Sequence, residues 1–503
     1  MVVEASRVAV GTIQVAATTL ANQLIAFIFY LGIARLLTLE DVGVMSLMLS
    51  TIAIFNTLTL LALNSAVIKY VSEFLGRGDL ASASAASRKA FKAITLISAV
   101  AFTAVAFLSP VILGGAFHGG IATSTLLLLL GTGLLLNYTS YYGAVMTGLA
   151  MFGTLALQNL IYFTASKFPA LALAYMGFGV DSVALGFFLG ASICLVFSIV
   201  VVRGRMAKGT TSLPLRALFS FSLPVYVLNI ISLAQGWMDI LALYSLTSAL
   251  ASTGIYFVVV ASVGMLSILW SPLASTLFPA LSSRYGANGA ESVKYALTRA
   301  LKLTAVTVML VSSALAAVSP TALSVVYGQS YVVGAVPFAI LAILSSFLAL
   351  SALFVTALQA INRTGYIAVA GALSLLANGA VLLLLVEPLG LLGAALGRAA
   401  MAIVAFIANY LALRTSLKVP WNTIPIRKGI SAAVIVGGSL FFLDSTLRLV
   451  GLPPLVTAAL DLALFLPTAL VCQKRLKLLD REDLELLGVM LPGRLRVVIK
   501  ILG

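Results

Sequence analysis

Long apolar runs recur along the whole of this 503-residue chain. A helix needs about 20 consecutive apolar residues to cross the hydrocarbon core of a bilayer. Runs of that length follow one another here, separated only by short polar or Gly/Pro turns. Hydrophobic residues make up 61% of the chain and charged residues 9%, whereas a soluble domain is roughly 45–50% apolar and 25% charged. No soluble core could hide this much apolar surface, so the sequence predicts an all-α integral membrane protein.

The apolar runs predict about fourteen transmembrane helices. The expected spans are 8–36, 42–70, 88–113, 121–147, 152–176, 180–202, 215–246, 250–282, 295–318, 334–360, 365–386, 391–413, 428–448 and 453–473. We expect the first to be a membrane span and not a cleaved signal peptide, because its apolar stretch is far longer than the roughly 7–15 residues of a signal h-region.

The basic residues test this topology. The formal net charge is +15, which in a soluble protein would suggest nucleic acid but here indicates basic loops on one side of a membrane. If the N-terminus is cytoplasmic, all but four of the 30 Lys and Arg fall in cytoplasmic segments. The four exceptions are Arg35, Lys167, Arg398 and Arg448. We therefore expect a multi-pass protein of the plasma membrane, with both termini cytoplasmic and no nucleic-acid partner.

Segments of the first half of the chain recur in the second half at a constant offset. The matched pairs, each 211 residues apart, are Gly43 with Gly254, Arg88 with Arg299, and Gly179 with Gly390. Each repeat contains six predicted helices, an even number, so both repeats enter the membrane in the same orientation. Such repeats form two pseudo-symmetric six-helix bundles related by an axis along the membrane normal, as in many transporters.

The repeat sets the expected domain organisation. We expect a six-helix bundle at 1–208, a second at 209–418, two additional helices at 419–473, and an amphipathic, basic cytoplasmic tail at 474–503. No loop is long enough to form a soluble domain.

Several motifs resemble one family of transporters. The stretch "GIARLLTLEDVGVMSLML" and the following "AVIKYVSEFLGRGD" resemble the opening of polysaccharide and oligosaccharide flippases. In the second half, Pro224, Asp239 and the run Gly254–Ile255–Tyr256 are similar to the family's helix-start proline, intrahelical Asp and "GIY" motif. The tail segment "LDREDLELL" also resembles the family. Leu39 departs from the pattern, since the family often has Pro there.

The resemblance implies membership of the multidrug/oligosaccharidyl-lipid/polysaccharide exporter superfamily. It implies a flippase that moves a lipid-linked oligosaccharide, on a polyprenyl phosphate or pyrophosphate carrier, from the inner to the outer leaflet by alternating access. The expected partners are the lipid-linked glycan and membrane lipids, and we expect a monomer.

Two cations lie deep in predicted spans. Lys167 is about nine residues before the outer end of its span, roughly 13 Å at 1.5 Å per residue. Arg398 is about seven residues into its span, also in the outer half. A charge at that depth is costly unless it is paired or faces water, so it indicates function. The alternative for Lys167 is a side chain that snorkels to the outer headgroups, helped by a kink at Pro169.

A lipid-linked glycan needs a cationic and polar pathway. Its phosphate requires charge-assisted hydrogen bonds from Lys or Arg, and its sugars require polar and aromatic side chains. The candidate cargo-binding residues are Lys167, Arg398, Arg35, Asn137, Tyr141, Gln158 and Asn159. Arg35 also fits an interface anchor, and Tyr141 an aromatic-belt residue. Asp239 is interpreted as the one clear acid inside a span, and it is the candidate for H⁺ or Na⁺ coupling or for a structural salt bridge.

Other functions fit the sequence less well. A lipid-II-type flippase remains open, as does a cation-coupled multidrug exporter, although membrane cations outnumber acids here. A membrane glycosyltransferase or polymerase would need paired carboxylates on a sizeable loop, and Glu40 and Asp41 lie in a short turn. The chain has no nucleotide-binding glycine loop. We therefore expect no enzyme, no cofactor and no metal, apart from possible coupling to H⁺ or Na⁺.

Overall fold

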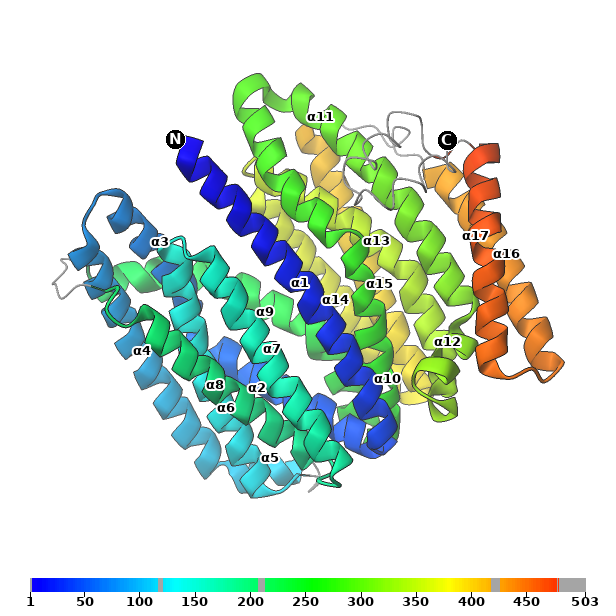
Figure 1. The fold of residues 1–503 in the computed structure, drawn as a ribbon, viewed down its shortest axis with the longest axis horizontal. Helices are drawn as coiled ribbons and strands as arrows, with labels where there is room; N and C mark the ends of the chain where they lie inside the picture. Colours follow the sequence, from blue (N-terminus) through cyan, green and yellow to red (C-terminus); the bar gives the residue numbers. More distant parts are fainter. Residues whose placement is uncertain (1, 116–120, 207–212, 418–425, 477, 479–503) are drawn as a thin grey trace. The chain divides into compact units, whose positions relative to one another are not determined.

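The computed structural model describes residues 2–115, 121–206, 213–417, 426–476 and 478. Nearly all of these residues are helical and none of them forms a strand, which confirms the all-α prediction. The chain divides into two compact units, Met1–Phe257 and Val258–Gly503 (Figure 1). Nearly all of the predicted tail helix lies outside the described residues.

Unit 1 is a bundle of long helices with two short ones. Its elements are α1 (Val2–Leu36), α2 (Leu39–Leu60), α3 (Leu63–Gly76), α4 (Leu80–Phe107), α5 (Ser109–Gly115), α6 (Thr123–Gly148), α7 (Phe152–Tyr175), α8 (Asp181–Val202), α9 (Leu215–Thr247) and the first half of α10 (Leu250–Gly264).

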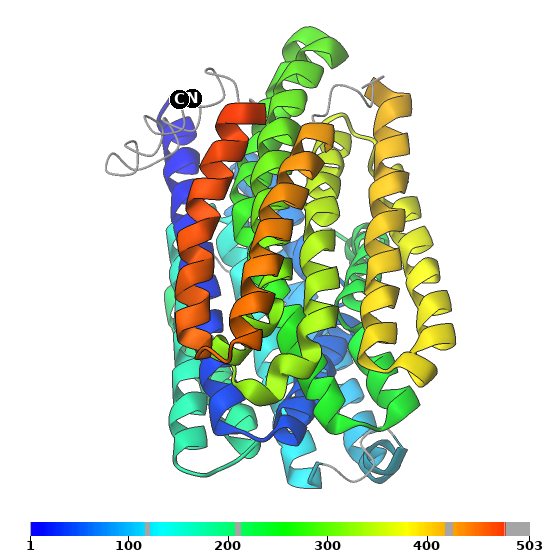
Figure 2. The same ribbon diagram turned by 90° about the vertical axis from the view of Figure 1, so that its right-hand side faces the viewer.

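Unit 2 contains the rest of α10 and a second bundle. Its further elements are η1 (Met265–Leu269), α11 (Ser271–Ala317), α12 (Ser319–Val326), η2 (Gln329–Gly334), α13 (Ala335–Ala360), α14 (Thr364–Leu389), α15 (Leu391–Leu417), α16 (Ile426–Leu449) and α17 (Pro454–Leu476). Helices α16 and α17 lie side by side as an antiparallel pair at the edge of this unit (Figure 2).

Twelve segments of the described chain are long and apolar enough to cross a membrane. Helices α6 and α7, with 26 and 24 residues, are not among them, since polar side chains lower their hydropathy. Both nevertheless have the length of a span, which needs about 20 residues. With these two helices, the described segments account for the prediction of about fourteen spans. The protein is thus a multi-pass membrane protein.

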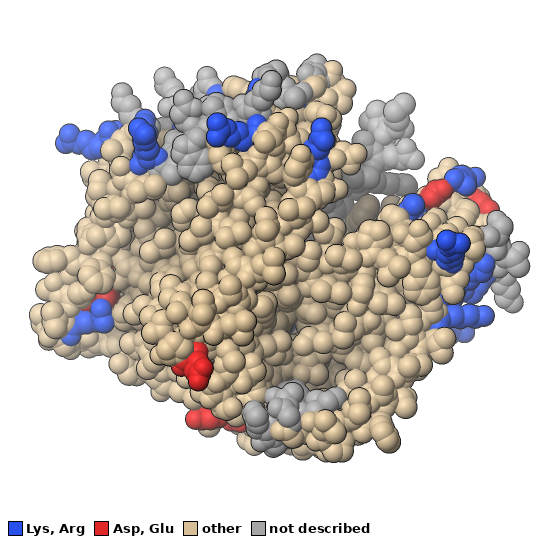
Figure 3. All heavy atoms as spheres, turned by 180° about the vertical axis from the view of Figure 1, so that it is seen from behind, with Lys and Arg blue, Asp and Glu red and all other residues tan. Residues whose placement is uncertain are grey.

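Hydrogen bonds in unit 1 show which connections share an end of the bundle. The Lys89 ammonium at the start of α4 donates to the Leu213 carbonyl before α9, at 2.7 Å. At the other end, the Thr125 hydroxyl on α6 donates to the Asp181 carboxylate on α8, at 2.8 Å. Basic connections predicted to lie on one side therefore meet at one end of this unit. On the face shown in Figure 3, Lys and Arg gather in a few groups, and large areas between them carry no charged side chain.

The internal repeat has a physical counterpart inside unit 1, where the N-terminal parts of α2 and α10 touch. A Cβ atom on Gly43 would lie 2.2 Å from the Leu250 carbonyl oxygen, and one on Gly254 would lie 2.3 Å from the Leu39 carbonyl oxygen. These two contacts are equivalent under the repeat, because Leu39 and Leu250 are also 211 residues apart. Backbone therefore packs on backbone at repeat-related positions, and only glycine fits at either one.

Two predicted spans are not single helices. The span 42–70 is divided at Leu61 and Ala62, whose φ angles of 45° and 54° are left-handed, so that α3 continues separately. The span 250–282 is divided by η1. Helix α11 then begins with Pro272 in its first turn, where the missing N–H costs no helical hydrogen bond. Helix α11 runs on to residue 317 through Gly289, whose φ of 70° interrupts the helix.

Candidate functional site

Lys167 lies on α7, in a place created by close packing of α7 on α8. A Cβ atom on Gly186 would lie 2.5 Å from the Ala170 Cβ, and one on Gly190 would lie 2.5 Å from the Ser166 nitrogen. This small-xxx-small spacing lets two membrane helices approach backbone to backbone. Lys167 lies between these contacts and is only 5% exposed. The side chain is therefore enclosed within unit 1. The snorkelling alternative requires a side chain that extends along a lipid-facing surface, and Lys167 does not do so.

Three phenylalanine rings surround the Lys167 ammonium. The Nζ atom is 3.9 Å from the centroid of Phe163, 5.4 Å from that of Phe187 and 5.7 Å from that of Phe29. The rings come from α7, α8 and α1 respectively. A cation within about 6 Å of an aromatic centroid is attracted by the ring quadrupole. The rings therefore hold the ammonium in place but do not neutralise its charge.

Among the described residues, no carboxylate lies within ion-pair distance of Lys167 and no residue hydrogen-bonds to its ammonium. Buried charges in proteins are normally paired, because leaving water costs several kcal/mol per ion. A buried cation without a protein anion is a site where an anionic ligand gains both charge and hydrogen bonds. Within unit 1, the Lys167 ammonium is therefore a candidate partner for a phosphate oxygen.

The other predicted cations are placed differently. Arg398 lies on α15 in unit 2, where it is half-buried, and Arg35 is exposed in the last turn of α1. At the offset of 211 residues, Arg398 corresponds to Phe187, and Lys167 corresponds to the buried Asn378 on α14. Each repeat thus carries one deep cation. Lys167 lies on the fifth predicted helix of the first repeat, and Arg398 lies on the sixth predicted helix of the second. Lys167 and Arg398 lie in different units, and a cavity shared by the two stays a prediction.

Two of the predicted polar residues bridge helices of unit 1. The Asn137 amide on α6 donates to the Thr59 hydroxyl at 2.6 Å and to the Ser98 hydroxyl at 2.9 Å, which joins α6 to α2 and α4. The Gln158 amide on α7 donates to the Thr139 carbonyl at 2.9 Å and to the Ser198 hydroxyl at 2.8 Å.

Both of these amide nitrogens are thus used between helices. Tyr141 is also buried, and its hydroxyl shares a 2.5 Å hydrogen bond with Ser87, whereas Asn159 is exposed. A role for these four residues in sugar binding stays a prediction.

Asp239 connects two of the motifs that carry the family resemblance. Its Oδ2 accepts a 2.6 Å hydrogen bond from the hydroxyl of Tyr256, the tyrosine of the "GIY" run, and its Oδ1 accepts from the Ile240 N–H at 3.0 Å. Asp239 is 1% exposed. The carboxylate therefore has donors on both oxygens. Ion coupling through Asp239 stays a prediction.

Unit 2 contains a large apolar groove. It has a volume of about 740 Å³ and lies among α11, α13, α15 and α16. Ile343, Val434 and Phe441 line it and are themselves more than half exposed. A groove bordered by exposed apolar side chains in a membrane protein faces lipid, so its size and lining suit a hydrocarbon chain.

Sequence reasoning missed one set of residues. The interpretation of Asp239 as the one clear acid inside a span was wrong, because Asp444 on α16 and Asp461 on α17 are 0% and 4% exposed. Asp444 is four residues from the predicted span end at 448. The available signal was one acid inside each of two consecutive apolar spans.

Comparison with known proteins identifies relatives of the chain. The family described as polysaccharide biosynthesis protein matches residues 8–285. No curated protein matches the chain.

Several solved structures share its fold. The lipid II flippase MurJ, in an inward closed conformation, superposes with a TM-score of 0.69 at 15% identity, covering 92% of this chain and 99% of that one. A multidrug resistance transporter of the MATE family, facing inward, gives 0.62 at 13% identity, covering 80% and 99%.

A third structure comes from Pyrococcus furiosus. This transporter of the MOP superfamily gives a TM-score of 0.55 at 14% identity, covering 82% of this chain and 96% of that one. It is described as having a binding pocket of reverse polarity that suggests a different function. At these identities the likenesses establish the fold, which is that of MOP-superfamily transporters.

Proposed function

The chain belongs to the polysaccharide biosynthesis protein family, and from this premise we propose that it is a flippase for lipid-linked oligosaccharides. Its cargo is a glycan on a polyprenyl phosphate or pyrophosphate carrier, and it moves from the inner to the outer leaflet by alternating access. The protein acts as a transporter and not as an enzyme. It works as a monomer in the plasma membrane with both termini in the cytoplasm.

The observation that carries this proposal is the buried Lys167 ammonium, which no described carboxylate neutralises. An uncompensated cation in a membrane span is costly, and an anionic ligand supplies the missing negative charge. The junction between lipid and sugar in the proposed cargo is a phosphate or pyrophosphate. Cation–π contacts with three rings fix the ammonium in position, so its hydrogen-bond donors remain for phosphate oxygens.

The apolar groove in unit 2 supports the lipid part of the proposal. Its volume of about 740 Å³ and apolar lining suit part of a polyprenyl chain, while charge and hydrogen bonds bind the headgroup. An ordinary soluble substrate has no need for a lipid-facing apolar groove. A multidrug exporter acting on organic cations has no need for an uncompensated lysine.

A lipid-II-type flippase is the second candidate, and the overall likeness to the lipid II flippase MurJ favours it. Lipid II also carries a polyprenyl pyrophosphate, so Lys167 and the groove fit both cargoes. The two candidates differ in the glycan, and a transport assay with both cargoes separates them.

Translocation in proteoliposomes tests the proposal. The wild-type protein should move a fluorescent polyprenyl-pyrophosphate oligosaccharide between leaflets, and Lys167→Met should reduce the rate at least tenfold, because a charge-assisted hydrogen bond is worth about 1.5–3 kcal/mol. Lys167→Arg should retain more activity than Lys167→Met, because it keeps the charge.

Lys69 provides a matched control, since it also lies over aromatic rings, at 4.4 Å from Phe221 and 4.8 Å from Tyr70, but is exposed. Lys69→Met should leave the translocation rate close to that of the wild type. Full translocation by Lys167→Met, or none by the wild type with any polyprenyl-linked glycan, would contradict the proposal.

A further inference from the structure

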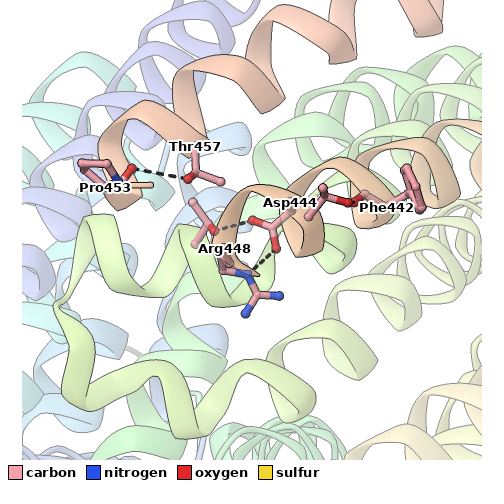
Figure 4. A network of polar contacts seen from close by, with 7 residues as sticks. Phe442, Asp444, Arg448, Pro453 and Thr457 are labelled. Atoms are coloured by element: carbon pink, nitrogen blue, oxygen red, sulfur yellow. Dashed lines mark hydrogen bonds and ion pairs between the residues drawn. The ribbon is translucent and has the colours of Figure 1, made fainter. Parts of the chain in front are cut away.

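The antiparallel pair α16 and α17 carries two buried carboxyl groups. Asp444 on α16 is 0% exposed and Asp461 on α17 is 4% exposed. Both helices lie beyond the two predicted repeats, so the internal symmetry does not explain these acids. Figure 4 shows Asp444 within a network of polar contacts at the end of α16, near the turn that leads into α17.

Asp444 has a donor on each of its oxygens. The Thr321 hydroxyl on α12 donates to Oδ1, and the Arg448 Nε donates to Oδ2 at 2.8 Å, one turn along α16 (Figure 4). The Arg448 side chain is 40% exposed. Asp444 therefore accepts hydrogen bonds from one neutral and one charged donor.

Asp461 has no such donors. Both of its carboxyl oxygens are buried, and neither has a hydrogen-bond partner among the described residues. The Thr457 hydroxyl, one turn earlier on α17, donates instead to the Pro453 carbonyl at 3.3 Å. Asp444 lies on the neighbouring helix α16, at a similar distance along the chain from the α16–α17 turn, and it is the acid whose charge acts on Asp461. Two neighbouring carboxylates both accept hydrogen bonds and neither donates.

The charges around Asp461 do not balance. Helix α17 packs on α16 and α12. Among the described residues, Asp444 and Arg448 are the charged groups that face Asp461, and α12 contributes the neutral Thr321. Two carboxylates and one guanidinium leave one uncompensated negative charge in a buried place. One proton removes that charge and also supplies the missing donor, since two adjacent carboxyls bind a single proton between them.

We propose that Asp461 and Asp444 form a proton-binding site in which a proton on Asp461 donates a hydrogen bond to an Asp444 oxygen. The proton comes from water, and the neutral carboxyl that results fits the buried surroundings of Asp461. The site binds a single proton, because the Asp444 oxygens already accept hydrogen bonds from Thr321 and Arg448. This assignment does not depend on the identity of the transported cargo.

A cavity gives the site access to solution. It has a volume of about 290 Å³, lies between α12, η2 and the α16–α17 turn, and is lined by Thr321 and Arg448 together with Ser324 and Gln329. The two side chains that donate to Asp444 therefore also line the cavity. The cavity therefore adjoins the Asp444 network, at the end of unit 2 that the sequence predicts to be extracellular. In this proposal the proton exchanges with that side of the membrane.

Infrared difference spectroscopy on the purified full-length protein tests the site. As the pH is lowered, the wild type should gain a protonated-carboxyl C=O band that shifts in D₂O, and Asp461→Asn should lose this band. Asparagine supplies the N–H donor that the proton would supply, so this variant should fold. Asp239→Asn is the matched control, because Asp239 is equally buried but has its own donors, and it should keep the band.

Several outcomes would overturn the assignment. A wild-type spectrum without a pH-dependent carboxyl band would contradict it, as would a band that persists in Asp461→Asn. Loss of the band when Na⁺ is added at constant pH would show that a metal cation occupies the site in place of a proton. If Asp461→Asn does not fold, Asp461→Leu gives the same test, because it also removes the carboxyl and leaves no buried acceptor without a donor.

Discussion

The surroundings of Lys167 in unit 1 and of Asp461 in unit 2 are opposites. Lys167 is a buried cation held by three aromatic rings with no described carboxylate to neutralise it. Asp461 is a buried acid that faces a second acid and has no described donor. Each is incomplete without a ligand of the opposite charge, and the ligands differ in kind. A cation among phenylalanines lacks an anion, whereas two neighbouring carboxyls need only a proton.

Asp239 is a buried acid whose two carboxylate oxygens both have hydrogen-bond donors. It is as deeply buried as the other two, yet Tyr256 and the Ile240 N–H donate to its two oxygens. Burial alone therefore does not mark a ligand site. The distinguishing feature is a buried charge that lacks its partner.

The largest expected effect is on stability, and it follows from substitutions of Lys167 that reverse or remove its charge. Lys167→Glu should lower the free energy of unfolding by about 3–5 kcal/mol, the cost of an uncompensated buried charge, because the negative faces of three rings repel a carboxylate. Lys167→Met should equal or exceed the wild type in thermal stability, since a side chain of similar length replaces a desolvated charge. Thermal unfolding in detergent provides the measurement. A Lys167→Met variant markedly less stable than the wild type would show that the ammonium serves folding.

A smaller effect is expected at Asp239. Tyr256→Phe removes the hydroxyl that donates to Oδ2, and a buried acceptor without its donor costs about 1–3 kcal/mol. Thermal unfolding in detergent measures this loss. Unchanged stability would mean that the Tyr256 hydroxyl does not stabilise the buried Asp239 carboxyl.

Much of the fold follows from the sequence because membrane insertion depends on quantities that the sequence displays. Apolar runs give the spans, and basic residues give the connections that share an end. The repeat offset pairs Gly43 with Gly254, and the two helices that carry these glycines touch at both of them. The break at Leu61 and Ala62 could not be predicted, because both residues are apolar and neither is a glycine or proline.

The sequence predicts the cation of the candidate site but not the side chains that surround it. A lone lysine in an apolar span is conspicuous, so Lys167 could be identified. Its three rings come from α1, α7 and α8, and only the packing of α7 on α8 through Gly186 and Gly190 shows what surrounds the ammonium. Asp444 and Asp461 were missed for the same reason. They lie in consecutive spans, and their proximity depends on how α16 turns into α17.

Ligand binding to purified protein tests the central claim most directly, namely that Lys167 lacks an anion that the cargo supplies. The measurement compares the affinity of a polyprenyl phosphate with that of the uncharged polyprenol of equal chain length, in the wild type and in Lys167→Met. The wild type should prefer the phosphate by about tenfold or more, as one charge-assisted hydrogen bond allows. Lys167→Met should bind the two lipids with equal affinity. Its affinity for the polyprenol should equal that of the wild type. An undiminished preference for the phosphate in Lys167→Met would contradict the account.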